Sequence, residues 1–233
     1  MDVAIEVRDG WRKLGGRDVL RGVTCRFPAH RLTALLGPSA SGKSLLLRHL
    51  VGLDRLDAGE IIAEGRSLGS LSASELLELR QRWGVQPEGP GALFSSMTVA
   101  ENIAFPLRAV LRLPENEVEA SVQERLAQVG LEEVADRYPQ QLAQGERVRA
   151  SFARAVAVRP RLVILDSPER GHDAAALADF GRVIGLTQEV LECTLILVTQ
   201  DVPLALALAH HVVLLNEGRV VAEGTATEVR PYL

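Results

Sequence analysis

Eight consecutive residues, 37–44, carry the side chains and the glycines that phosphate binding requires. They read G-x-x-x-x-G-K-S and are, in order, Gly37, Pro38, Ser39, Ala40, Ser41, Gly42, Lys43 and Ser44. In such a loop the glycines let backbone N–H groups close around phosphate oxygens, the lysine reaches the β- and γ-phosphates, and the serine hydroxyl binds Mg²⁺. The pattern therefore predicts a nucleotide phosphate site, against the alternative of a glycine- and serine-rich turn that binds nothing.

The segments on either side of this loop supply the elements that the site needs. Residues 32–36 are a short apolar run that suits a buried strand, and residues 45–50 suit a helix. A helix that begins directly after the loop adds the partial positive charge of its N-terminus to the site. Strand, glycine loop and helix in this order are the context in which the motif predicts phosphate binding.

The composition limits the classes of protein to which the chain can belong. Its 233 residues are enough for one large domain with a buried core. The formal net charge of −4 gives no electrostatic reason to expect a nucleic-acid partner. Cys25 and Cys193 lie far apart and form no C-x-x-C pattern, so neither a disulfide framework nor a zinc site is predicted.

No stretch of the chain reads as a membrane or export segment. Residues 1–6 lack the basic start and the long apolar run of a signal peptide. The longest nearly apolar run, residues 202–215, contains Pro203, His210 and His211 and is too short to span a bilayer. We therefore expect a soluble, cytoplasmic protein that reaches a membrane only through a partner.

Strand and helix patterns alternate around a helix-rich middle. Strands are predicted at residues 3–7, 19–27, 60–63, 162–165, 194–199, 212–216 and 219–222. Helices are predicted at residues 72–82, 98 to a break at Pro106, 115–129, 145–158 and 174–190. The first two would each begin with a capping box, Ser72-x-x-Glu75 and Thr98-x-x-Glu101. A turn is expected at residues 57–59, and residues 84–91 are too rich in glycine and proline for regular structure. We interpret residues 1–233 as a single domain whose α/β core, about 1–83 and 159–233, is interrupted by a helical insert, about 84–158.

Three stretches resemble the ATP-binding subunits of ATP-binding-cassette (ABC) transporters. They are the loop at 37–44, the strand that ends at Asp166, and the helix that begins at Leu142-Ala143-Gln144-Gly145-Glu146. The resemblance runs from Ile5 to about Glu228. It implies an α/β fold of the P-loop NTPase (RecA-like) type, with a parallel-sheet core, an antiparallel N-terminal β subdomain and a helical insert subdomain. Residues 91–94 and 98–108 are most similar to the ATPases of bacterial lipid-trafficking systems that work with MCE proteins.

The resemblance also implies cofactors and partners. Two such subunits, identical or different, would form a head-to-tail dimer with ATP and Mg²⁺ between the loop at 37–44 of one and the partner's signature segment. In this chain the signature segment corresponds to Ala143, Gln144, Gly145 and Glu146. A transmembrane permease would dock near residues 84–108 on the inner face of the cytoplasmic membrane and link the chain to an MCE-type lipid-binding protein. The candidate Mg²⁺ ligands are Ser44, Asp166 and Gln86.

Two departures from the family pattern concern catalysis. The family places a glutamate after Asp166 to polarise the attacking water, and this chain has Ser167. A serine hydroxyl titrates far above neutral pH and cannot accept a proton as a carboxylate does. The family places a histidine after the strand at 194–199, where this chain has Gln200, whose amide can bind phosphate but cannot change its charge. Together these positions predict slow hydrolysis.

Other departures concern binding. Ala143 lacks a signature hydroxyl, Gln144 replaces a glycine, and Glu146 adds a negative charge near the start of the signature helix. Leu14 aligns with the aromatic residue that stacks on adenine, although Trp11 is three residues away. For the glutamine loop that precedes the docking segment, Gln86 is the nearest glutamine, but Glu88 lies closer to the expected spacing.

Three functional interpretations remain open at this stage. The chain could be a degenerate transporter subunit that binds ATP-Mg²⁺ and hydrolyses it poorly or not at all. It could be a working ATPase that has recruited Glu88, Glu169 or Asp173 as the base. It could instead be a soluble regulatory ATP-binding module, although such family members usually carry two cassettes in one chain and this chain has one.

Overall fold

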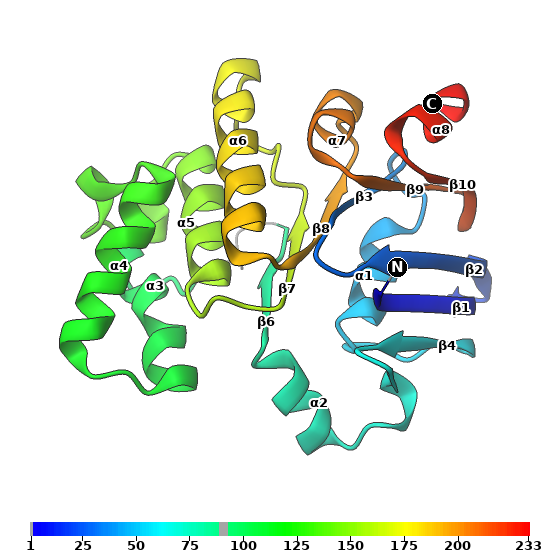
Figure 1. The fold of residues 1–233 in the computed structure, drawn as a ribbon, viewed down its shortest axis with the longest axis horizontal. Helices are drawn as coiled ribbons and strands as arrows, with labels where there is room; N and C mark the ends of the chain where they lie inside the picture. The colour runs from blue at the N-terminus through cyan, green and yellow to red at the C-terminus, as the bar shows by residue number, and fades with distance from the viewer. Residues whose placement is uncertain (1, 89–92) are drawn as a thin grey trace. The chain divides into compact units, whose positions relative to one another are not determined.

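The computed structural model describes residues 2–88 and 93–233 (Figure 1). The chain divides into one unit made of Met1–Arg80 and Glu192–Leu233, and a second made of Gln81–Leu191. Both contain parallel strands and helices, and the first also contains an antiparallel sheet, so the α/β P-loop fold expected from the sequence is confirmed.

The first unit contains two sets of strands. The antiparallel sheet has the order β2-β1-β4-β5, with β1 at Val3–Leu14, β2 at Arg17–Pro28, β4 at Ala58–Ala63 and β5 at Arg66–Ser67. The other strands follow the order β10-β9-β3-β8, with β3 at Leu32–Leu36, β8 at Thr194–Thr199, β9 at His211–Asn216 and β10 at Arg219–Gly224. Strand β3 runs parallel to both β8 and β9, and β9 and β10 form an antiparallel hairpin. The helices of this unit are α1 (Lys43–Leu50), α2 (Ala73–Arg80), α7 (Val202–Leu208) and α8 (Ala226–Val229).

The second unit is mostly helical. Strands β6 (Trp83–Gln86) and β7 (Leu162–Asp166) pair in parallel. The helices are α3 (Val99–Pro106), α4 (Glu115–Val129), α5 (Gln144–Val156) and α6 (Ala174–Leu191). The predicted break at Pro106 is confirmed, since α3 ends there and a π-helical turn follows at Leu107–Leu111. The predicted capping box is also confirmed, because the Thr98 hydroxyl accepts from the Glu101 N–H and the Glu101 carboxylate accepts from the Thr98 N–H.

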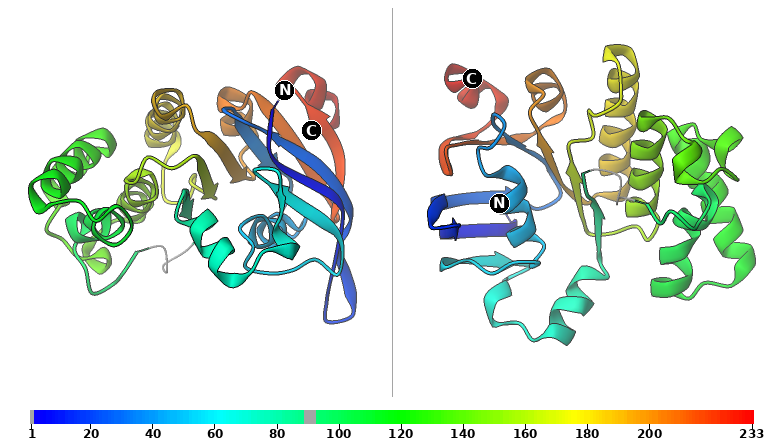
Figure 2. Two further views of the ribbon diagram at one scale, coloured as in Figure 1. Left: turned by 60° about the horizontal axis from the view of Figure 1, so that its bottom comes forward. Right: turned by 180° about the vertical axis from the view of Figure 1, so that it is seen from behind.

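The long N-terminal hairpin differs from the prediction. Strands β1 and β2 form one twisted ribbon that closes at Gly15 and Gly16, whereas residues 8–18 were not predicted as strand (Figure 2). Leu14 pairs with Arg17, and both glycines have positive φ, as a two-residue hairpin turn requires. The predicted turn at 57–59 is wrong in part, because β4 already begins at Ala58. The short helix α7 was also missed, although Asp201 caps it and Pro203 lies in its first turn.

The prediction of irregular structure at residues 84–91 is wrong for Gly84 to Gln86, which belong to β6. Residues 89–91 lie outside the described part of the chain. Gly84 is not a turn residue: a Cβ atom built on it would lie 2.1 Å from the carbonyl oxygen of Ala155 on α5. The glycine therefore permits close packing of α5 against a buried strand.

We expect Gly84→Ala to lower the free energy of unfolding by about 1–3 kcal/mol, because the added methyl group forces strand and helix apart. Gly69→Ala is the matched control, since a Cβ atom there meets no atom within 4 Å and the position has no positive φ. Urea titrations of both variants measure the difference. Equal stability of the two variants would contradict this account of Gly84.

Within residues 2–88 and 93–233, no helix combines the length and apolar character that crossing a bilayer would require.

Candidate functional site

The phosphate loop of the first unit follows a fully buried strand. All five residues of β3 are buried, and the chain then turns at Gly37, where a Cβ atom would lie 2.1 Å from the carbonyl oxygen of Leu215. Gly42 has φ 105° and forms the left-handed start of α1. A side chain at Gly37 would collide with β9, and one at Gly42 would strain the backbone, so the two glycines of the motif allow the loop its shape.

Lys43 is buried and its ammonium group lies within the loop. The Nζ atom donates to the carbonyl oxygens of Gly37 and Pro38, both at 2.8 Å, and lies 3.4 Å from the Ser41 hydroxyl. Ser44, in the first turn of α1, is exposed, as are Pro38, Ser39 and Ala40. A fixed cation inside an accessible loop at a helix N-terminus fits a phosphate group.

The structure brings Gln200 to the same edge of the sheet as the phosphate loop. Leu36 at the end of β3 pairs with Thr199 at the end of β8, and the two strands are parallel. Gly37 and Gln200 therefore leave the carboxyl ends of neighbouring strands, where α/β sheets bind ligands. The following residue, Asp201, accepts from the Leu204 N–H and caps α7.

The candidate adenine contact is an exposed aliphatic side chain. Leu14, at the end of β1, is 48% exposed. Trp11 is held elsewhere, because its indole N–H donates to Asp9 at 2.9 Å and its ring lies against Gly22. Stacking of Trp11 on a base would require breaking both contacts.

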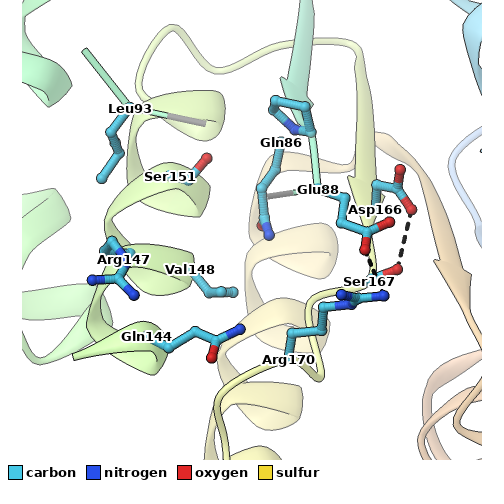
Figure 3. A pocket seen from close by; sticks show the side chains of 11 residues that line it. Gln86, Glu88, Leu93, Gln144, Arg147, Val148, Ser151, Asp166, Ser167 and Arg170 are labelled. Carbon is cyan, nitrogen blue, oxygen red and sulfur yellow. Dashed lines mark hydrogen bonds and ion pairs between the residues drawn. The ribbon is translucent and has the colours of Figure 1, made fainter. Parts of the chain in front are cut away.

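The second unit contains a pocket of about 210 Å³ that holds most of the remaining predicted residues (Figure 3). Gln86 reaches it from the end of β6, Asp166 and Ser167 from the end of β7, and Gln144 from the first turn of α5. The register explains this convergence, since Gln86 pairs with Leu165, the residue before Asp166. Four residues from three motifs that lie far apart in the sequence thus line one cavity.

Ser167 is buried beside Asp166 in a strained conformation. Its φ of 54° is left-handed, which is uncommon for serine and is typical of functional sites. Its hydroxyl donates to Asp166 Oδ1 at 3.2 Å (Figure 3). The Ser167 side chain therefore acts as a donor to the neighbouring carboxylate.

Gln86 offers an unused acceptor in the same pocket. The residue is buried, and its Oε1 atom has no hydrogen-bond partner among the described residues. Carboxylate and amide oxygens are hard ligands that suit Mg²⁺, so Gln86 and Asp166 fit such an ion. In residues 2–88 and 93–233, no group of three or more His, Cys, Asp or Glu side chains could hold a metal by itself.

An ion pair that sequence reasoning missed lies in this pocket. Glu88 and Arg170 are joined at 2.5 Å, and both line the cavity with Ser167 (Figure 3). The sequence marks Glu88 as a candidate for the glutamine loop and for the base, but its pairing with a residue 82 positions later has no local signal.

The signature segment at the start of α5 is held by backbone contacts. The Glu146 carboxylate accepts from the Ala143 N–H at 2.7 Å, but the alanine has no hydroxyl to return the bond, so only half of a capping box forms. A Cβ atom built on Gly145 would lie 2.9 Å from the carbonyl oxygen of Gly171, so the two glycines lie close together. Gly171 has φ 80° and lies against Gln144, which fixes the segment 171–173 beside the signature helix.

Comparison with known proteins relates these features to a family. The sequence profile described as "ABC transporter" matches residues 20–170. The chain is 38% identical over 98% of its length to the sulfate/thiosulfate import ATP-binding protein CysA of Mycolicibacterium paratuberculosis, of which it spans 61%. It is 34% identical over 95% of its length to the intermembrane phospholipid transport ATP-binding protein MlaF of Escherichia coli K12, of which it covers 82%.

A solved structure shows the same fold. The ATP-binding cassette MJ0796, a dimer in a post-hydrolysis state with ADP and Pi, superposes with a TM-score of 0.87 at 25% identity, covering 95% of this chain and 98% of that one. Taken with the phosphate loop after β3 and the aspartate at the end of β7, these matches show that the chain belongs to the ABC transporter family as an ATP-binding domain.

Proposed function

We propose that this chain is the ATP-binding subunit of a bacterial transporter of a lipid-related substrate, and that it hydrolyses ATP weakly or not at all. The observation that carries the proposal is the Ser167 hydroxyl, which donates to Asp166 in the place of a catalytic carboxylate. ATP would act chiefly as a ligand that favours a closed dimer, by binding that state more tightly than the open one. Closure would then gate a permease.

The residues of this chain have separate roles in that scheme. Lys43 would bind the β- and γ-phosphates, and Ser44, Asp166 and Gln86 would hold Mg²⁺, which neutralises phosphate charge when bound. The Gln200 amide would donate to the γ-phosphate. Since Ser167 cannot accept a proton from water near neutral pH, the γ-phosphate would persist.

The substrate class rests on one relative and one segment. MlaF belongs to a phospholipid transport system, and residues 91–94 and 98–108 resemble the ATPases of MCE systems. CysA, whose name refers to sulfate and thiosulfate, matches at slightly higher identity over a smaller share of its length. We assign a lipid-related substrate, an MCE-type protein reached through the permease, and a position on the inner face of the cytoplasmic membrane. The MJ0796 dimer supports pairing with a second subunit, identical or different.

A second candidate function is a working ATPase that uses Glu88 as its base. Glu88 lines the pocket of Asp166 and Ser167, which favours it over Asp173, whose carboxylate accepts from the Ala176 N–H at the start of α6. The ion pair with Arg170 holds the Glu88 carboxylate in the pocket.

We expect Glu88→Gln to leave the rate of phosphate release within about twofold of wild type, because the degenerate site uses no carboxylate base. Glu115→Gln is the matched control, since Glu115 also pairs with an arginine in the second unit, Arg108, but does not line the pocket. A fall of about 10² or more for Glu88→Gln alone would establish the second candidate instead.

The predicted permease contact centres on two exposed aromatic residues. Phe94 and Phe105 are 43% and 41% exposed, and their rings meet edge to face at 4.9 Å. The Arg154 guanidinium lies 4.9 Å from the centre of the Phe94 ring. Aromatic residues held in place at a surface are typical of protein interfaces, so we place the docking site here.

A buried asparagine holds this surface. Asn102 accepts from the Phe94 N–H at 2.8 Å and donates to the carbonyl oxygens of Phe94, Met97 and Thr98. These bonds fix the loop between residue 93 and α3. Ala92, within the predicted docking segment, lies outside the described residues.

We expect Phe105→Asp to reduce the amount of co-purified permease about tenfold or more, because loss of a central aromatic contact typically costs about 2 kcal/mol or more. Leu77→Asp on α2 is the control, since Leu77 is similarly exposed but lies in the first unit. Unchanged permease yield from both Phe94→Asp and Phe105→Asp would contradict this docking site. A chain that captures no permease under any condition would be the regulatory module instead.

A further inference from the structure

A pocket of about 160 Å³ in the second unit lies apart from the residues considered so far. It is formed by the C-terminal halves of α4 and α6 and by the residue that precedes Pro160. Its lining combines charged and apolar side chains: Glu124, Arg125, Gln128, Arg159, Leu186, Thr187, Val190 and Leu191.

Arg125 is the buried charge of this pocket. It is only 6% exposed, and burial lowers the pKa of its guanidinium from the usual range. Its Nη1 atom donates to Gln128 Oε1 at 2.5 Å, and Nη2 lies 3.1 Å from the exposed carboxylate of Glu124. The Nε–H group has no partner in the described part of the chain. A buried guanidinium with an unused donor calls for a further acceptor.

A chain of hydrogen bonds fixes the orientation of this guanidinium. Gln128 accepts from Arg125 and donates through Nε2 to the Thr187 hydroxyl at 2.6 Å. Thr187 in turn donates to the carbonyl oxygen of Val183 at 2.6 Å. These hydrogen bonds join α4 to α6 and set the guanidinium plane before any ligand binds. The entropy cost of binding is therefore lower.

A second arginine brings the same charge to the pocket. Arg159 is exposed and has a left-handed φ of 51°. Its positive charge lowers the pKa of Arg125, whereas the carboxylate of Glu124 raises that pKa. Two arginines and one glutamate leave a single positive charge. A monoanion balances that charge, and a planar carboxylate matches the guanidinium fork.

The rim of the pocket is apolar and exposed. Leu186 and Val190 are 60% and 71% exposed, and at i and i+4 they lie on one face of α6. Thr187 lies between Leu186 and Val190 in sequence, and its hydroxyl takes part in the hydrogen bonds that orient Arg125. The group attached to the carboxylate should therefore be apolar.

We propose that the pocket between α4 and α6 binds a monocarboxylate that carries a short apolar chain. Arg125 and Arg159 bind the carboxylate, and Leu186 and Val190 cover the apolar part of the ligand. The same chemistry occurs in a free alkanoic acid and in the C-terminal residue of an apolar peptide, so both sources are tested.

The test is a titration of the folded full chain, followed by NMR of its backbone amides. The probes are hexanoate and the peptide acetyl-Ala-Leu with a free carboxylate, and the neutral controls are hexanamide and acetyl-Ala-Leu-amide. We expect one acid to bind with a Kd on the order of 1 mM and to shift amides of α4 and α6. Binding of hexanoate alone assigns a free acid, and binding of the peptide alone assigns a C-terminus. No binding by either acid, or equal binding by the amides, would overturn the proposal.

Variants separate this site from unspecific attraction. Arg159→Gln should weaken binding about tenfold, because one charge-assisted contact is lost. Arg182→Gln should not change it, since Arg182 is an exposed arginine of α6 that pairs with Asp179 and does not line the pocket. Leu186→Ser with Val190→Ser should weaken hexanoate but not acetate. An equal effect of both arginine variants would reject the assignment.

Discussion

Changing Ser167 to Glu and Gln200 to His together is expected to raise the rate of ATP hydrolysis by about 10² to 10⁴, the usual contribution of a positioned acid or base. The glutamate would accept a proton from the attacking water, and the imidazole would bind the γ-phosphate with a group that can carry charge. The two gains should not simply multiply, because under the proposed function both groups would act on one water and one phosphate.

The surroundings of Ser167 define the controls for this experiment. Ser167→Ala removes the hydrogen bond to Asp166 but adds no base, so it should leave hydrolysis slow. Glu88 and Arg170 share the pocket, and a new carboxylate would compete with Glu88 for Arg170. Adding Glu88→Gln to the double variant should therefore preserve the gain. If the double change adds nothing to a wild-type enzyme that already turns over about once per second, another residue is the base.

Lys43→Ala is expected to weaken ATP binding by about 10- to 100-fold. The ammonium group would meet the β- and γ-phosphates, and hydrogen bonds to charged groups contribute about 1.5–3 kcal/mol each. Lys13→Ala is the control, because Lys13 is the only other lysine of the chain and is exposed on β1, 3.6 Å from Asp18. Titration with ATP-Mg²⁺ measures both affinities.

The contacts of Lys43 also demand a folding check, since its ammonium holds the carbonyl oxygens of Gly37 and Pro38. A thermal melt of Lys43→Ala separates loss of binding from loss of structure. Unchanged ATP affinity in a folded variant would show that nucleotide does not use the phosphate loop. If the folded wild-type protein binds no ATP at millimolar concentration, the assignment of residues 37–44 as a nucleotide site is wrong.

The sequence predicted the elements that carry local signals. The phosphate loop, the strand that ends at Asp166 and the capping box at Thr98 each depend on residues within a few positions of one another. Helix α4 begins and ends as predicted, because Gly130 adopts the left-handed conformation that stops it.

The errors arose where distant residues decide the structure. Gly84 contributed to the prediction of irregular structure, but the carbonyl oxygen of Ala155 is what requires a glycine there. The pairing of Glu88 with Arg170 and the approach of Gln128 to Thr187 each join residues more than 50 positions apart. Two errors did have local signals: the pair Gly15-Gly16 indicates a hairpin turn, and Asp201 with Pro203 indicates the start of α7.

The most direct test of the central claim measures ATP binding and phosphate release in one sample of the wild-type subunit, assembled with its permease and with ATP-Mg²⁺ in excess. The proposed function predicts that nucleotide binds while phosphate is released at about 0.01 s⁻¹ or slower, 10² or more below an ordinary enzymatic rate of order 1 s⁻¹. Binding accompanied by release at about 1 s⁻¹ would contradict the assignment of Ser167 and Gln200 as a degenerate pair.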